Sequence, residues 1–209
     1  MTSNKFVRKL FFLLSFLLLA ACHANTKGTE PVPHWFDAYS SFKMKDYQEY
    51  FNRELQEMSP DFMPYGAWVK QFYELRDGAP LWTLNGLQEH KVDTLSHFIS
   101  EYYTHGLPAS SFGFVDADSC IRQLKDNAVD NEAEALYETL FKLEMNLTES
   151  FLRYATAMKF GATDPKRVNG EKWLNKTQKA DSLFVIESLQ QFGNLAATLE
   201  NMAPHDTNY

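Results

Sequence analysis

The chain has 209 residues, of which 44% are hydrophobic and 22% are charged, so its composition is that of an ordinary globular protein. Its net charge of −7 leaves no surplus of cations, which excludes a nucleic-acid binder held by phosphate contacts. The length predicts one domain, or two at most.

The N-terminus has the pattern of an export signal. Three basic residues precede a short apolar run over residues 10–21. That run is too short to cross a bilayer, which takes about 20 apolar residues. It ends in Leu-Ala-Ala-Cys, the pattern of a bacterial lipoprotein signal. We therefore predict a lipoprotein signal peptide over residues 1–21 and a lipid on the thiol of Cys22. An ordinary secretory signal with a chance cysteine is the alternative.

Residues 22–34 contain two prolines and mostly polar or small residues, and they predict a tether from the lipid to the first packed element. Removing the signal takes away three of the 20 basic residues, so 17 face 27 acidic residues and the net charge is near −10. His23, rather than an aspartate, follows Cys22, which favours onward sorting. We therefore expect the chain in the cell envelope, anchored through the lipid on Cys22 and facing the periplasm, at the outer membrane rather than the inner one.

Apolar residues recur at helical spacing along the rest of the chain, and no stretch alternates as a strand would. We therefore predict one all-α domain over residues 35–209, an irregular bundle of five to seven helices. The longest pattern spans residues 132–160 and stops at Gly161. Its apolar stripe consists of Leu136, Leu140, Leu143, Leu147, Phe151, Tyr154 and Met158. Shorter helical patterns cover residues 47–55, 65–76, 87–103, 115–125 and 183–192.

Few residues offer chemistry. Cys120 lies among acidic residues, which disfavour a thiolate, so we interpret it as a small packed residue rather than a nucleophile. His90 and His97 lack the spacing of a metal site, and we interpret them as surface residues. The sequence predicts no catalytic residue, no metal site and no cofactor. The many aromatic residues are typical of a helical core, with an aromatic groove for stacking a glycan as the alternative.

Three segments, which follow one another along the chain, contain residues that end helices and apolar residues that pack. They are FYELRDGAPLW at residues 72–82, YTHGLP at residues 103–108 and EMNLTESFLRYA at residues 144–155. Together they resemble the N-terminal scaffold region of the large murein L,D-transpeptidases of the YcbB type. The resemblance covers about residues 65–209.

This resemblance implies a helical scaffold beside a peptidoglycan-binding domain and a catalytic domain, in a protein that cross-links peptidoglycan. The family's catalytic cysteine lies in a Ser-x-Gly-Cys motif, which the sequence lacks, so no catalytic residue is carried over. We expect a non-catalytic scaffold module, truncated before the catalytic domain, with the missing transpeptidase and peptidoglycan-binding domains as partners. The alternative is a stand-alone, lipid-anchored periplasmic adaptor that binds an envelope protein or a glycan.

Overall fold

The computed structural model describes residues 33–101, 109–130, 132–162 and 179–202. The chain divides into two units, Met1–Glu30 and Pro31–Tyr209, and all described residues belong to the second. The predicted signal peptide, Cys22 and most of the predicted tether therefore lie outside the described residues. None of the described helices is long and apolar enough to span a membrane.

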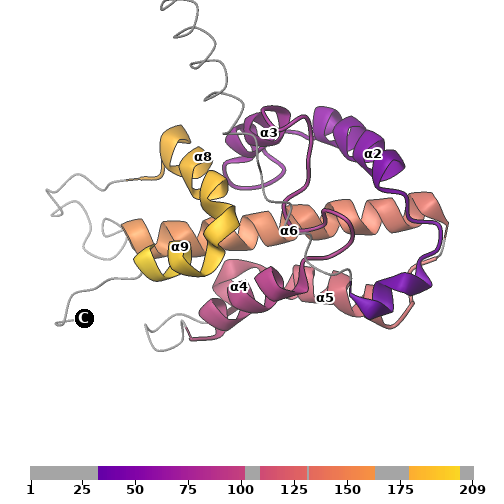
Figure 1. The fold of residues 1–209 in the computed structure, drawn as a ribbon. Coiled ribbons are helices and arrows are strands. Elements are labelled where there is room, and N and C mark those ends of the chain that lie inside the picture. Colours follow the sequence, from indigo (N-terminus) through magenta and orange to yellow (C-terminus); the bar gives the residue numbers. More distant parts are fainter. Residues whose placement is uncertain (1–32, 102–108, 131, 163–178, 203–209) are drawn as a thin grey trace, which may run out of the picture. The chain divides into compact units, whose positions relative to one another are not determined.

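The described residues form helices and contain no strand, which confirms the predicted all-α fold class (Figure 1). The α-helices are α2 (Met44–Glu57), α3 (Gly66–Glu74), α4 (Glu89–Glu101), α5 (Phe114–Lys125), α6 (Ala133–Phe160), α8 (Ser182–Gln190) and α9 (Leu195–Met202). The short 3-10 helices η2 (His34–Ala38), η4 (Ala109–Phe112) and η6 (Gln191–Asn194) precede α2, α5 and α9.

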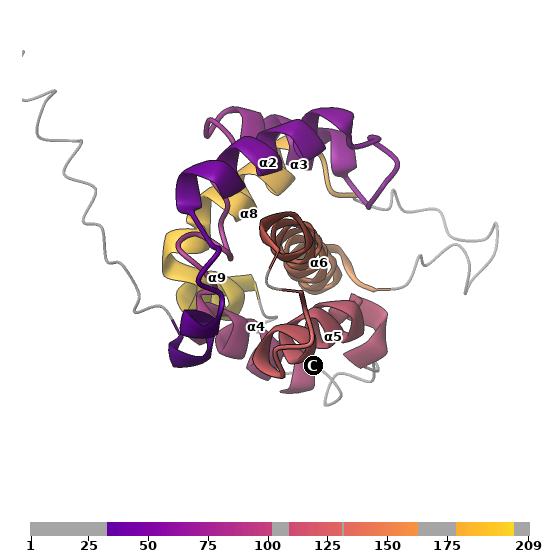
Figure 2. The ribbon, with the colours of Figure 1, turned by 90° about the vertical axis from the view of Figure 1, so that its right-hand side faces the viewer.

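The long helix α6 is the centre around which the other helices pack (Figures 1 and 2). Helices α2 and α3 lie on one side of it, α4 and α5 on the other, and α8 and α9 beside its C-terminal half. Every residue of the predicted stripe is buried. The helix ends as predicted at Gly161, which adopts φ 86° and donates its N–H to the Ala157 carbonyl at 2.9 Å. Helix α6 is therefore the element against which the residues of the surrounding helices are held.

The segment before α2 is fixed by polar contacts to α4 and α5. The indole Nε1 of Trp35 donates to Glu89 Oε1 at 2.8 Å, and Lys125 Nζ lies 2.8 Å from the same oxygen. The hydroxyl of Tyr39 donates to the carbonyl of Leu124 at 2.9 Å. Helix η2 is therefore part of the fold, although its own sequence is too short for a helical periodicity.

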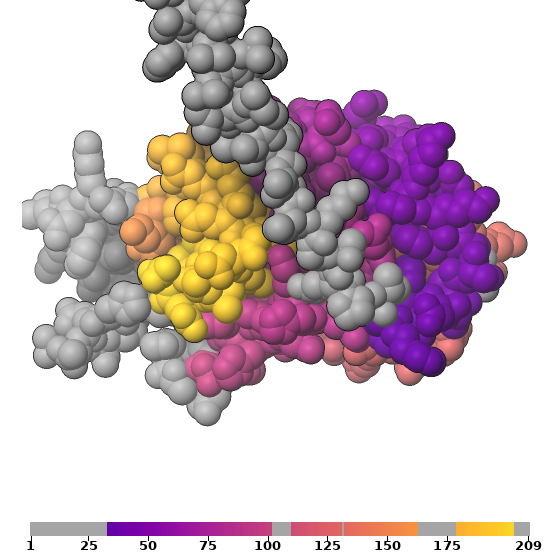
Figure 3. All heavy atoms as spheres, viewed as in Figure 1, coloured from indigo at the N-terminus to yellow at the C-terminus, as the bar shows by residue number. Residues whose placement is uncertain are grey.

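The C-terminal segment differs from the prediction. The pattern over residues 183–192 predicted one helix, but α8 ends at Gln190, and η6 leads into a further helix, α9. Helix α9 packs against α4, and Figure 3 shows its yellow atoms next to the magenta atoms of α4. Its buried residues are Leu195, Thr198 and Leu199. Two large apolar residues were too few for a periodicity argument, so the sequence analysis missed this helix.

Candidate functional site

A single carboxylate on α6, that of Glu144, gathers hydrogen bonds inside the bundle. Its side chain is fully buried. Oε1 accepts from the backbone N–H of Leu81 at 2.5 Å and from the hydroxyl of Tyr73 at 2.7 Å. Oε2 accepts from the backbone N–H groups of Trp82 and Thr83 and from the Thr83 hydroxyl, each at 2.9 Å. All five partners are donors, so the arrangement is complementary to a carboxylate.

One indole–hydroxyl contact and two hydroxyl–hydroxyl contacts surround this carboxylate. The indole Nε1 of Trp82 donates to Thr148 Oγ1 at 3.1 Å, and that oxygen lies 2.8 Å from the Tyr73 hydroxyl. The Tyr47 hydroxyl lies 2.8 Å from Thr83 Oγ1. Because Tyr73 and Thr83 direct their own hydrogens to the carboxylate, Thr148 and Tyr47 act as the donors in these two contacts.

The surroundings change the pKa values of this cluster. Burial raises the pKa of Glu144 above its ordinary value, and the hydrogen bonds from Tyr73, Leu81 and Thr83 oppose that rise. Burial, followed by the charge of the nearby carboxylate, raises the pKa of Tyr73 well above its usual value, and likewise that of Tyr47. Both phenols therefore stay neutral in the folded protein at neutral pH.

The cluster is closed to substrate and acts as a structural tie. The side chains of Tyr47, Tyr73 and Trp82 are fully buried, as are those of Thr83 and Thr148. It joins the first of the three resembling segments, residues 72–82, to the third, residues 144–155, across 62 to 75 positions of the chain.

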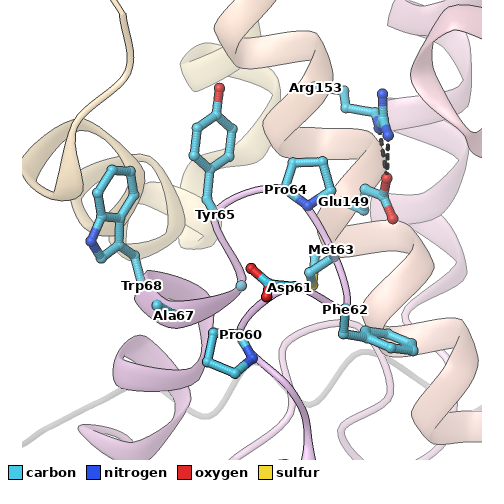
Figure 4. A pocket seen from close by; sticks show the side chains of 11 residues that line it. Pro60, Asp61, Phe62, Met63, Pro64, Tyr65, Ala67, Trp68, Glu149 and Arg153 are labelled. Carbon is cyan, nitrogen blue, oxygen red and sulfur yellow. Dashed lines mark hydrogen bonds and ion pairs between the residues drawn. The ribbon is translucent and has the colours of Figure 1, made fainter.

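An open groove lies between the α2–α3 loop, residues 58–65, and the helix α6 (Figure 4). Its volume is about 740 Å³. We call it the aromatic groove. Its lining consists of Pro60, Asp61, Phe62, Met63, Pro64 and Tyr65 of the loop, Gly66, Ala67 and Trp68 of α3, and Glu149 and Arg153 of α6.

The two walls of the aromatic groove differ in chemistry. Tyr65 and Trp68 form a stacked pair, with ring centroids 5.7 Å apart and planes 8° from parallel. Phe62 is 58% exposed in the same loop. On the side of α6, Arg153 Nη2 lies 2.6 Å and Nε 2.7 Å from Glu149 Oε1 (Figure 4). An aromatic wall therefore faces a wall that offers hydrogen-bond donors and acceptors.

The backbone of Tyr65 is strained. It adopts the left-handed conformation, with φ 63° and ψ 19°, which costs a bulky residue about 1–2 kcal/mol. The neighbours hold it there. A Cβ on Gly66 would lie 2.3 Å from the Pro60 carbonyl oxygen, so the chain passes closely at this point. The side chain of Met63 is buried under the loop. Strain of this kind is concentrated at functional sites, where surrounding packing maintains it.

A second, smaller hollow continues the aromatic groove along α6. Its volume is about 240 Å³, and it shares Pro64, Tyr65 and Arg153 with the groove. Thr156 also lines it, and the buried Oγ1 of that residue has no hydrogen-bond partner among the described residues. The two hollows therefore adjoin at the residues that they share.

The structure supports the interpretation of Cys120 as a packed residue. It lies half-buried in α5. Burial, together with the charge of Asp116, raises the pKa of its thiol, and Lys142 and Asn146 only partly oppose that rise. The group is therefore a thiol at neutral pH rather than a nucleophilic thiolate.

The two histidines lie on the exposed surface of α4. His97 Nε2 lies 3.6 Å from Glu101 Oε1, and His90 is exposed to solvent. No group of three metal-ligating residues lies together anywhere in the described part of the chain. Both histidines are exposed, as the sequence analysis interpreted them.

The sequence analysis placed neither the Glu144 cluster nor the aromatic groove. Glu144 lies four residues after Leu140 and three before Leu147 of the apolar stripe, so a charge at that helical position could have been recognised as buried and partnered. The sequence analysis kept an aromatic groove as an alternative but could not say which residues form it, because the left-handed turn at Tyr65 has no sequence signature.

Comparison with known proteins shows the family. The chain matches the Scaffold domain family over residues 67–209, about two-thirds of its length. The predicted resemblance to the scaffold region of the L,D-transpeptidases, over about residues 65–209, is thereby confirmed. Among curated proteins and among solved structures, no match is found. The matched region contains Glu144 and residues 81–83, whose backbone N–H groups bond to it. The chain belongs to the Scaffold domain family.

Proposed function

We propose that this chain is the non-catalytic scaffold module of an L,D-transpeptidase-like cell-wall lipoprotein. The family match over residues 67–209 carries the proposal. The buried tie supports it, because two of the three segments that carry the resemblance meet there in structural contacts. The catalytic and peptidoglycan-binding domains of such a protein are the partners that this module would hold.

The environment of Cys120 supports the absence of catalysis by this chain, since burial keeps its thiol protonated. The test is to incubate the purified chain with muropeptides that carry tetrapeptide stems. We expect no L,D-cross-linked product. Cross-linking that disappears in Cys120→Ala would overturn this part of the proposal.

The link to the cell wall has a genetic test. We expect deletion of the gene to lower the fraction of L,D cross-links in the peptidoglycan of the producing organism, and the wild-type chain to restore it. An unchanged muropeptide composition would overturn the cell-wall link and leave the family membership unaffected.

The anchor is proposed from the sequence alone, through the lipoprotein pattern that ends at Cys22. We expect the chain to incorporate labelled palmitate and to fractionate with the outer membrane. The variant Cys22→Ala should lose both properties. Incorporation of the label into Cys22→Ala would contradict lipidation at this position.

A stand-alone adaptor is the second candidate function. The observation that favours it is the aromatic groove, which is open to solvent and lined by side chains of mixed chemistry. An adaptor of this kind would act through its own surface rather than through a transpeptidase domain.

A further inference from the structure

We propose that the aromatic groove binds a saccharide strand, which stacks on Tyr65 and Trp68 and bonds to the polar side chains of the opposite wall. The proposal rests on the proposed cell-wall function and deepens it, because it names the chemical class that the module would hold.

The aromatic wall fits the C–H face of a sugar ring. Tyr and Trp combine a large apolar face with a polar tip, so they suit a ligand that is apolar on one side and wet at its rim. Tyr65 and Trp68 are half-buried, and their rings are nearly parallel. The strained turn at Tyr65 places the first ring beside the second. The Tyr65 ring packs partly against the core, and its remaining exposed surface is available to a ligand in the aromatic groove.

The polar wall fits hydroxyl and amide groups. On α6, Arg153 offers guanidinium donors and Glu149 offers carboxylate acceptors, and Asp61 of the loop adds a second carboxylate. These three side chains carry a net charge of −1, and the whole chain is acidic. A phosphate-rich or polyanionic ligand is therefore disfavoured, while a ligand with many neutral hydrogen-bonding groups finds both donors and acceptors.

The backbone of the loop favours a saccharide over an extended peptide. An added peptide strand needs a row of backbone groups to pair with. Here the N–H of Phe62 donates to the Ser59 carbonyl at 3.0 Å, and that of Trp68 donates to the Tyr65 carbonyl at 2.9 Å. The N–H of Gly66 is also engaged within the loop, at 3.0 Å. Recognition in the aromatic groove therefore depends on side chains.

The second hollow gives the strand room to continue. It adjoins the aromatic groove at Tyr65 and Arg153, so a strand longer than the groove would extend toward it. Thr156 is among the residues that line this second hollow.

The test is a titration of the full chain with the hexamer of N-acetylglucosamine, followed by calorimetry. We expect binding, and we expect Trp68→Ala to weaken it about tenfold, the loss of one ring-stacking contact. The decisive variant is Tyr65→Asn. Asparagine tolerates the left-handed backbone, and the strain that it relieves offsets the lost packing of the half-buried ring. This variant should therefore unfold near the wild-type melting temperature while losing binding by about tenfold.

The matched control is Tyr50→Asn, which removes another half-buried tyrosine from α2, outside the groove. It should bind the hexamer as the wild type does. The proposal is overturned if Tyr65→Asn and Trp68→Ala bind like the wild type, or if a proline-rich peptide binds and the hexamer does not. Hexamer binding with unchanged cell-wall cross-links would contradict the proposed function while the saccharide site stands.

Discussion

Glu144 places a charge in the centre of a helical bundle, where an unpaired carboxylate would cost several kcal/mol. Five donors replace its water shell, three of them consecutive backbone N–H groups of residues 81–83. Those three N–H groups bond to the side chain instead of to a helix or a sheet. Each partner therefore satisfies the other, and the segment that leads from α3 to α4 is fixed on α6.

Glu144→Gln should destabilise the protein by about 2–4 kcal/mol. Each carboxylate oxygen accepts at least one backbone N–H, so the amide nitrogen of glutamine must face a donor in either orientation. Urea unfolding followed by circular dichroism measures the change. The matched control is Glu138→Gln on the same helix, where an exposed ion pair with Lys142 is lost. It should cost less than about 1 kcal/mol, and equal losses in both variants would contradict the role of Glu144.

Tyr73 gives a pH dependence with a definite sign. Its pKa is raised by burial, so the folded state keeps the phenol proton above pH 10, where the unfolded chain releases it. Its contribution to the free energy of unfolding is complete below that pH and is lost as the pH rises through the folded-state pKa. Each such tyrosine lowers the free energy of unfolding by about 1.4 kcal/mol per pH unit in that range.

In Tyr73→Phe that slope should be shallower by about 1.4 kcal/mol per pH unit, because one proton no longer takes part. Urea unfolding at a series of alkaline pH values gives both slopes. A variant whose slope equals that of the wild type would show that Tyr73 ionises freely in the folded state.

At the scale of elements, α6 differs from the helices around it. It has 28 residues, and its buried positions extend beyond the predicted stripe to Tyr137, Glu144 and Thr148. The shorter helices bury one face each, such as Val92, Leu95 and Ile99 on α4. Packing against α6 is therefore the shared requirement of the bundle.

Leu147→Ala should destabilise the protein by about 2–5 kcal/mol, because it leaves a cavity in the fully buried stripe of α6. Leu75→Ala is the matched control. That residue is the C-cap that follows α3 and is 70% exposed, so its truncation should change the free energy of unfolding by less than about 0.5 kcal/mol. Urea unfolding of the two variants measures both changes, and we expect a clearly lower midpoint for Leu147→Ala. Similar midpoints would contradict the role of α6 as the centre of the core.

At the scale of the whole molecule, the spacing of apolar residues predicted the features that depend on short stretches of sequence. The stripe of α6, its end at Gly161 and the all-α class followed from spacing. Helix α9 was missed because its burial depends on contact with α4. The Glu144 cluster joins residues more than 60 positions apart, and nothing in a single sequence places such partners together. The aromatic groove depends on one left-handed residue, Tyr65, whose type gives no hint of that conformation.

The described part of the chain should unfold in one cooperative transition. Its buried residues, from η2 to α9, form one continuous core. Trp82 lies within it, with its ring in edge contact with Phe151 of α6 and Phe192 of η6. The C-terminal helices therefore share the core with the rest, and tryptophan fluorescence and far-ultraviolet circular dichroism should report the same urea midpoint. Two separated transitions, with part of the helical signal lost before the fluorescence changes, would show that α8 and α9 form an independent unit.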